Sequence, residues 1–200
     1  MAPPRENSHC SSCGAAHLPG AGWPRTCPAC GHTAYRNPLP VAVALLPVRS
    51  APGSGSGPGS GSGPGSGSGP GSATGLVVVR RTIEPRRGLL ALPGGFVDHD
   101  ESWQQAVVRE LEEETGIRAP ADDVRLADAL SSPGGHLLLF GLLPARDAGT
   151  LPPSAPTDET GGWQILPAPA ELAFPLHTRA AATWFADGYS GSGAPHTRTG

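Results

Sequence analysis

The sequence contains no lysine, and aromatic residues make up only 5% of it. All 14 basic residues are arginine, which excludes a lysine nucleophile or Schiff base. Any clamp for phosphate must therefore be built from arginine or backbone amides. Hydrophobic residues reach 38%, whereas 29 glycines and 24 prolines exceed a quarter of the 200 residues. This composition indicates a substantial unstructured fraction, and the remaining residues, about 150, suffice for one packed domain.

Long apolar segments are also lacking. There is no run of about 18 apolar residues that could span a membrane, and the first nine residues lack the apolar core of a signal peptide. We therefore expect a cytoplasmic protein with no membrane contact. The net charge of −3 argues against general affinity for nucleic acid. The oligomeric state stays open, with a homodimer as one option.

The four cysteines form two closely spaced pairs, Cys10-x-x-Cys13 and Cys27-x-x-Cys30. Each pair can hold one side of a tetrahedral zinc ion from a tight turn. Disulfides are the alternative, but a reducing compartment would keep these thiols free for a metal. We expect residues 1–36 to form a zinc ribbon with four cysteine ligands, in which zinc is structural.

A short helix that follows a glycine-rich loop carries acids in an unusual place. At about 100° per residue, Glu110 and Glu114 point the same way as Ala106 and Val107, with Glu113 beside them. Amphipathic helices normally place acids on the solvated face, and like charges at i,i+4 repel. One interpretation is a solvated run of charge. The other is a cation site, for which hard oxygen ligands favour Mg²⁺ or Mn²⁺.

The spacing of these acids matches a family motif. Gly95 is followed by five residues, Glu101, seven residues, and then Arg109-Glu110-Leu111-x-Glu113-Glu114-x-Gly116-Ile117. This pattern fits the Nudix box with no substitution, so the chain resembles the Nudix hydrolases. The resemblance implies an α+β fold, the α/β/α sandwich with a mixed sheet. It also implies metal-dependent cleavage of a pyrophosphate bond in a small nucleoside diphosphate substrate.

The resemblance further assigns metal ligands. It implies that Glu110, Glu113 and Glu114 hold the catalytic Mg²⁺ or Mn²⁺, with the backbone carbonyl of Gly95 as a further ligand. Glycines here let the backbone come close to metal and phosphate. Gly116 is expected to end the helix in a left-handed conformation.

The remaining site candidates orient the acids or accept a proton. The planar fork of Arg109 suits it to holding the carboxylates in place, and Glu101 could brace it. Glu159, before Trp163, is our candidate for the additional acid that Nudix enzymes often bring from a loop outside the box, as base or ligand. The general base is thus Glu110 or Glu159. Weaker candidates for a base are His99 and His136, and for phosphate contacts Arg80, Arg81, Arg86 and Arg87.

The domain organisation follows from composition and apolar patterns. Residues 37–187 are the expected Nudix domain, interrupted at 51–73 by a flexible loop that repeats Pro-Gly-Ser-Gly-Ser-Gly three times. Residues 188–200 are expected to be a disordered tail. The predicted strands are 38–48, 76–81, 89–92, 124–131, 136–143 and 163–166, and the closing helix is 177–187.

The substrate is less narrowly defined than the reaction. A cysteine ribbon before a Nudix domain resembles the NADH pyrophosphatases, whose hallmark after the box is Ser-Gln-Pro-Trp-Pro-Phe-Pro. Here the corresponding segment is Ser131-Ser132-Pro133-Gly134-Gly135-His136, without those aromatic residues. We therefore expect a substrate of the ADP-ribose or nucleotide-sugar type, with NADH/NAD pyrophosphatase as the alternative.

Two other classes of function stay open. A Nudix domain can be a ligand sensor or regulator without turnover, but this chain retains every carboxylate of the box. The ribbon could contact nucleic acid, although Arg25 and Arg36 make only a thin basic patch.

Overall fold

The computed structural model describes residues 8–18, 20, 22–49 and 74–189. The chain divides into two compact units, Met1–Pro38 and Leu39–Gly200. The predicted insertion at 51–73 and residues 190–200 of the predicted tail lie outside the described residues. In the first unit, β1 (Arg25–Thr26) pairs antiparallel with β2 (Thr33–Ala34).

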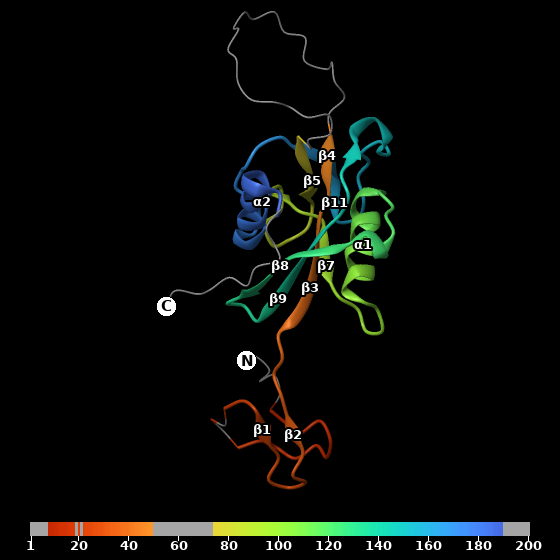
Figure 1. Ribbon diagram of the computed structural model, residues 1–200. Coiled ribbons are helices and arrows are strands. Elements are labelled where there is room, and N and C mark those ends of the chain that lie inside the picture. Colours follow the sequence, from red (N-terminus) through yellow and green to blue (C-terminus); the bar gives the residue numbers. More distant parts are fainter. Residues whose placement is uncertain (1–7, 19, 21, 50–73, 190–200) are drawn as a thin grey trace, which may run out of the picture. The chain divides into compact units, whose positions relative to one another are not determined.

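The second unit contains two sheets and two helices (Figure 1). One sheet has the order β7-β3-β9-β8, and the other has the order β10-β4-β5-β11 with β6 paired to β5. The strands are β3 (Leu39–Leu45), β4 (Pro47–Arg49), β5 (Gly75–Arg81), β6 (Leu90–Ala91), β7 (Gly94–Phe96), β8 (Arg125–Ser132), β9 (His136–Leu142), β10 (Arg146–Asp147) and β11 (Thr160–Leu166). The helices are α1 (Trp103–Thr115) and α2 (Pro175–Asp187), with short 3-10 turns η1 (Ala121–Asp123) and η2 (Ala148–Thr150). Because β3 runs parallel to β9 but antiparallel to β7, its sheet is mixed.

The second half of β3, residues 42–45, is buried on both faces, which explains the layered architecture. Its side chains alternate, so Val43 joins a cluster with Trp184 of α2. The small side chain of Ala42 points the other way, into a cluster with Val107 and Leu111 of α1. The two helices consequently lie on opposite sides of the strands (Figure 1). The predicted α/β/α sandwich with a mixed sheet is confirmed.

The apolar run predicted as one strand, 38–48, serves both sheets. It forms β3 and β4, separated by Leu46, whose carbonyl accepts a hydrogen bond from Val77 N–H at 3.0 Å. Prediction of a single strand was therefore wrong at this point, because a continuous apolar run does not reveal where the chain changes its pairing partner. Strands β7 and β10 were also not predicted, since they are only three and two residues long.

Helix α1 has well-defined ends. Ser102 is its N-cap, and it forms a capping box with Gln105: Gln105 N–H donates to Ser102 Oγ at 3.2 Å, and Ser102 N–H donates to Gln105 Oε1 at 2.7 Å. Gly116 ends the helix with φ 74°, and its N–H donates to Glu112 O at 2.7 Å, as predicted. These caps fix the rotation of the helix and therefore the direction of its acids.

Helix α2 and the segment before it hold residues 90–92, which precede the glycine-rich segment. His177 is buried, and its Nδ1 accepts a hydrogen bond from Leu92 N–H at 3.2 Å. Burial lowers the pKa of His177 to about 3, so the imidazole is neutral and able to accept. Nearby, the Leu90 carbonyl accepts a hydrogen bond from Ala173 N–H at 2.7 Å.

Within the part of the chain that the structure describes, neither α2 nor α1 is long and apolar enough to cross a bilayer.

Candidate active site

A cavity of about 760 Å³ lies beside the glycine-rich strand β7 and the acidic side of α1. Its charged lining is strongly unbalanced: seven acids against two arginines. The acids are Glu84, Asp98, Glu110, Glu113, Glu114, Asp158 and Glu159, and the arginines are Arg81 and Arg109. A polyanionic ligand would be repelled from such a cavity unless cations were also present.

Two of the predicted metal ligands are largely withdrawn from water. Glu114 is 6% exposed, and the side chain of Glu110 is 13% exposed. Glu114 Oε2 accepts a hydrogen bond from Gly94 N–H at 3.1 Å. The expectation that Glu113 also leans inward is wrong, because its side chain is 58% exposed. Glu113 nevertheless lines the cavity, from a more exposed position on α1.

The glycines of β7 permit this burial. A Cβ on Gly95 would lie 2.4 Å from Glu110 Oε1, and a Cβ on Gly94 would lie 2.4 Å from the Ala42 carbonyl of β3. Both distances are shorter than side-chain atoms tolerate, so a larger residue at Gly95 would push the Glu110 carboxylate aside, and one at Gly94 would collide with the backbone of β3. The absence of a side chain at Gly95 thus leaves the Glu110 carboxylate directly against the Gly95 backbone, while the approach of metal and phosphate to these glycines stays a prediction.

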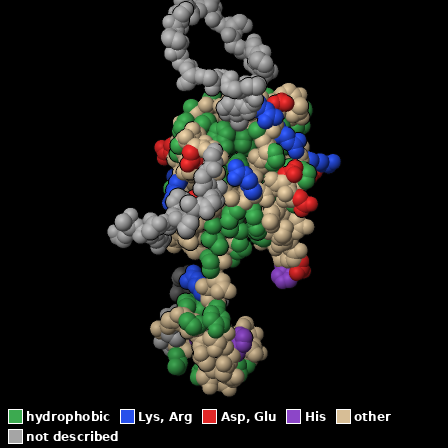
Figure 2. All heavy atoms as spheres, in the orientation of Figure 1, with side chains coloured by type: hydrophobic (Ala, Val, Ile, Leu, Met, Phe, Trp, Pro, Cys, Tyr) green, Lys and Arg blue, Asp and Glu red, His purple; other side chains and the backbone are tan. Residues whose placement is uncertain are grey.

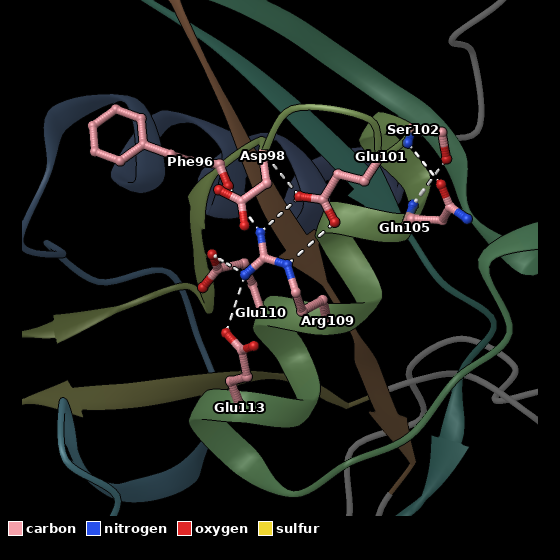
Figure 3. Close-up of polar contacts among 8 residues, drawn as sticks. All are labelled: Phe96, Asp98, Glu101, Ser102, Gln105, Arg109, Glu110 and Glu113. Atoms are coloured by element: carbon pink, nitrogen blue, oxygen red, sulfur yellow. Dashed lines mark hydrogen bonds and ion pairs between the residues drawn. The ribbon is translucent and has the colours of Figure 1, made fainter.

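Arg109 holds three carboxylates with one guanidinium (Figure 3). Its Nε and Nη2 donate to Glu101 Oε2 and Oε1 at 3.2 and 2.8 Å. Its Nη1 lies between Glu110 Oε1 at 2.8 Å and Glu113 Oε2 at 3.0 Å, while Nη2 also reaches the Phe96 carbonyl at 2.9 Å. The guanidinium lowers the pKa of Glu101. These contacts agree with an orienting role for Arg109.

Burial changes the titration of the inward acids. It raises the pKa of Glu114 to about 8, helped by the charges of Glu110 and Glu159 and opposed by the Gly94 N–H. Burial also raises the pKa of Glu110, although Arg109 opposes the change. Each carboxylate is thus costly to ionise in its site, and a cation would compete with a proton for it.

The loop before β11 brings Glu159 to the same cavity. Thr160 Oγ1 donates to the Glu114 carbonyl at 3.0 Å, which ties the loop to the end of α1. The Glu159 carbonyl accepts a bond from Thr82 N–H at 2.9 Å. The sequence suggested Glu159 but not the tie through Thr160, because a hydrogen bond across 46 positions leaves no local pattern.

Several weaker candidates lie elsewhere. Of the four arginines near the box, Arg81 lines the cavity, whereas Arg80, Arg86 and Arg87 do not. His99 pairs with Asp100 at 2.9 Å on the surface, and His136 contacts Phe96 instead of lining the cavity. Sequence reasoning missed Glu84, Asp98, Asp158 and Phe96. Of these, Asp98 and Phe96 lie among the variable positions of the box, where a fixed-position motif carries no information.

The four cysteines converge in the first unit. All four sulfurs lie within 4.8 Å of one another, with Cys10 Sγ and Cys30 Sγ 3.7 Å apart and Cys13 Sγ and Cys27 Sγ 3.7 Å apart. The thiols are free, so the structure contains no disulfide among them. Four sulfurs at this separation suit one tetrahedral ion.

Two equivalent turns create this arrangement. Gly14 N–H donates to the Cys10 carbonyl and Gly31 N–H to the Cys27 carbonyl, both at 2.9 Å. Both glycines have φ 74°, a conformation that side chains disfavour. Backbone amides from Cys30 and Ala29 lower the pKa of Cys27 to about 7, which favours the thiolate that a metal requires. Although the Ala15 amide opposes the change, the neighbouring Cys30 and Cys27 thiols raise the pKa of Cys13 to about 12, so a bound ion would have to displace that proton.

Comparisons with known proteins agree on one family. The sequence profile of the NUDIX domain matches residues 70–187. The ADP-ribose pyrophosphatase of Methanocaldococcus jannaschii is 48% identical over 42 residues, which are 21% of this chain and 25% of that protein. The chain thus spans only about a quarter of the length of that relative.

Solved structures show the same fold. A NUDIX hydrolase from Nitrosomonas europaea superposes with a TM-score of 0.63 at 19% identity, covering 96% of each chain. A MutT/nudix family protein from Enterococcus faecalis superposes with a TM-score of 0.50 at 18% identity, covering 68% of this chain and 46% of its own.

The raised pKa of Glu114 generates a prediction on pH. Between its ordinary value and about 8, the folded protein holds a proton that the unfolded chain has released, so this group lowers stability as pH rises through that window. A divalent cation must displace the same proton, so its affinity rises over the same window. We predict that the Mn²⁺-induced increase in Tm grows from about pH 6 to about pH 8.

The matched controls for this measurement are two glutamine variants of α1. Glu114→Gln should flatten the pH dependence, while Glu112→Gln, at an exposed residue that pairs with Arg118 at 2.6 Å, should preserve it. Identical pH profiles for the wild type and Glu114→Gln would contradict the assignment.

Proposed function

Because this chain belongs to the NUDIX domain family, whose profile covers more than half of it, we propose that it is a divalent-metal-dependent hydrolase. Its reaction would be cleavage of the pyrophosphate bond in a nucleoside diphosphate derivative. The observation that carries this proposal is the pair Glu110 and Glu114, held out of water against the backbone of Gly94 and Gly95. Such burial is unfavourable for two acids alone and is expected where a cation is to be bound.

The donor set fits Mg²⁺ or Mn²⁺. Glu110, Glu113 and Glu114 would supply carboxylate oxygens and Gly95 a carbonyl oxygen, and these hard ligands match both ions. When bound, the metal would neutralise the diphosphate and acidify a water molecule. Arg109 would keep two of the carboxylates oriented, because its Nη1 contacts Glu110 and Glu113 together.

The other lining residues have complementary roles in this proposal. Arg81 is the second cation of the cavity, and its Nε is fixed by a bond to the Pro85 carbonyl at 2.9 Å. It would contact a phosphate oxygen of the substrate. Glu159 also lines the cavity, on its anchored loop, with a carboxylate that Arg109 does not engage. We therefore favour Glu159 over Glu110 as the group that accepts the proton of the attacking water.

The proposed substrate class rests on the relative that matches this chain over 42 residues. The ADP-ribose pyrophosphatase from M. jannaschii shares 48% identity over 42 residues, which supports a substrate of the ADP-ribose type. The products would then be AMP and ribose 5-phosphate.

For the first unit we propose a structural zinc ion. Cys10, Cys13, Cys27 and Cys30 would complete its coordination, leaving no open position for a substrate. Since the unit has only two strands of two residues each among its described residues, the ion would supply much of its folding energy.

We predict about one zinc ion per purified chain by elemental analysis. Cys27→Ser should lose the ion and the dispersed amide NMR signals of residues 8–38, because a buried ligand is removed. Ser11→Ala, an exposed residue within the first turn, is the control and should retain both. A zinc-free chain with four oxidised cysteines and an ordered ribbon would refute the zinc proposal.

The hydrolase proposal is tested by Glu114→Gln. The amide can still accept the bond from Gly94 N–H, so the fold should persist. We expect kcat/KM to fall by about a hundredfold or more, since several kcal/mol of transition-state stabilisation would be lost. Release of the nucleoside monophosphate should be measured with Mg²⁺ or Mn²⁺ on ADP-ribose, nucleotide sugars and NADH.

The control is Glu112→Gln, the same change on the exposed side of the same helix, which should leave the rate within about twofold. An unchanged rate for Glu114→Gln would exclude the assigned site. Binding without hydrolysis across the whole panel would instead favour a ligand sensor.

A further inference from the structure

The carboxylate of Glu159 depends on the backbone of its loop for its position. In Figure 2 acidic side chains lie at several separate places on the surface of the second unit, so exposure alone does not distinguish Glu159. It lines the cavity together with Glu110 and Glu114, yet among the described residues its carboxylate has no hydrogen-bond or ion-pair partner. Its distance from the acids of α1 is therefore set by whatever holds the loop.

The next residue, Thr160, joins the loop to α1. It is 1% exposed, and its Oγ1 donates to the Glu114 carbonyl at 3.0 Å. A threonine hydroxyl has one proton to donate, so Thr157 must be the donor in the bond of 3.1 Å between the two threonine hydroxyls. Thr157 Oγ1 in turn accepts from Thr160 N–H at 3.1 Å and from Glu159 N–H at 3.4 Å. The hydrogen bonds thus run in one direction, from the loop amides through two hydroxyls to α1.

This contact also completes the end of α1. The Glu114 carbonyl lies in the last turn of the helix, where carbonyls have no N–H partner within the helix. Thr82, directly after β5, ties the same loop to the sheet, because its N–H donates to the Glu159 carbonyl at 2.9 Å. Its hydroxyl donates to the Asp158 carbonyl at 3.4 Å. The loop is therefore held to the sheet by Thr82 and to the helix by Thr160.

We propose that Thr160 is a positioning residue for the hydrolysis, because its hydroxyl sets the distance between Glu159 and the acids of α1. The proposal rests on the proposed function, in which Glu159 is the base. In that step the water oxygen bonds to phosphorus, its proton passes to Glu159, and the bridging P–O bond breaks with its electrons on the leaving phosphate. A base must lie within hydrogen-bond reach of the proton that it removes, and a displacement of about 1 Å can lower the rate about a hundredfold. Thr160 would thus control turnover from outside the cavity lining.

The test is a double-mutant cycle between Thr160 and Glu159, with Mg²⁺ and ADP-ribose, or a nucleotide sugar or NADH if that is cleaved faster. Thr160→Val keeps the shape of the side chain but cannot donate, so kcat should fall about tenfold or more while KM stays within about twofold. Glu159→Gln should lower kcat about a hundredfold. Adding Thr160→Val to Glu159→Gln should change kcat by less than about twofold, because the base that Thr160 positions is already lost. Thr160→Ser retains the hydroxyl and should keep kcat within about threefold of the wild type.

Two measurements without turnover accompany the cycle. Mn²⁺ affinity, measured by isothermal titration calorimetry, should be unchanged in Thr160→Val, because the Glu114 carboxylate is held by Gly94 N–H and not by Thr160. Gly162 N–H donates to Thr160 Oγ1 at 3.4 Å, so its hydrogen exchange should become about tenfold faster or more in Thr160→Val. Thr160→Ser should exchange at the wild-type rate.

The matched control is Thr150→Val. It removes another bond from a threonine hydroxyl to a carbonyl, that of Thr150 Oγ1 to Asp147 O at 2.8 Å. Thr150 is exposed and lies outside the cavity lining. This variant should leave kcat and the exchange of Gly162 unchanged.

An unchanged kcat in Thr160→Val would overturn the proposal, as would an equal loss from Thr160→Val with and without Glu159→Gln. A drop in Mn²⁺ affinity in Thr160→Val would also overturn it, because Thr160 would then act through Glu114. If Thr160→Val does not fold, Thr160→Ala, which leaves space in place of the hydroxyl, is put through the same cycle. A full rate in Glu159→Gln would refute the proposal and leave the hydrolase assignment intact, whereas a wild type that hydrolyses no substrate of the panel would refute both.

Discussion

The packing of α1 against the glycine strand β7 is the constraint on which the rest of the structure depends. It places Glu110 against Gly95 and Glu114 under the Gly94 amide, where both carboxylates lose most of their hydration. Such burial opposes folding unless hydrogen bonds or opposite charge compensate for it. Arg109 and one amide supply part of that compensation. The raised pKa of Glu114 shows that the compensation is incomplete, as expected of a site built to receive a cation.

The remainder of the fold holds this contact in place. Strand β3 pairs with β7 on one edge and packs against both helices through its two faces. His177 of α2 fixes the Leu92 amide just before the glycines, and Thr160 fixes the loop that carries Glu159. Unfavourable electrostatics at the site are thus offset by apolar packing elsewhere, a division common in functional sites.

Much of the site was predictable because it lies within one short segment. Helical geometry placed Glu110 and Glu114 on the same side of α1. The fixed spacing of the box identified Arg109 and Gly95, and the family resemblance carried by the box predicted the sandwich fold. The change of sheet at Leu46 depends on pairing with Val77, which no local pattern encodes. The exposure of Glu113 depends on the exact rotation of the helix. The exposure of Phe96 could not be predicted either, because β7 has only three residues and is too short to give a periodic signal.

The most direct measurement of the central claim is anomalous diffraction from crystals soaked in Mn²⁺. The buried acids are predicted to bind the ion, so an anomalous peak should lie within coordination distance of the Glu110 and Glu114 carboxylates and the Gly95 carbonyl. Ordered carboxylates in the same positions with no peak between them, at a Mn²⁺ concentration that saturates hydrolysis, would contradict the account.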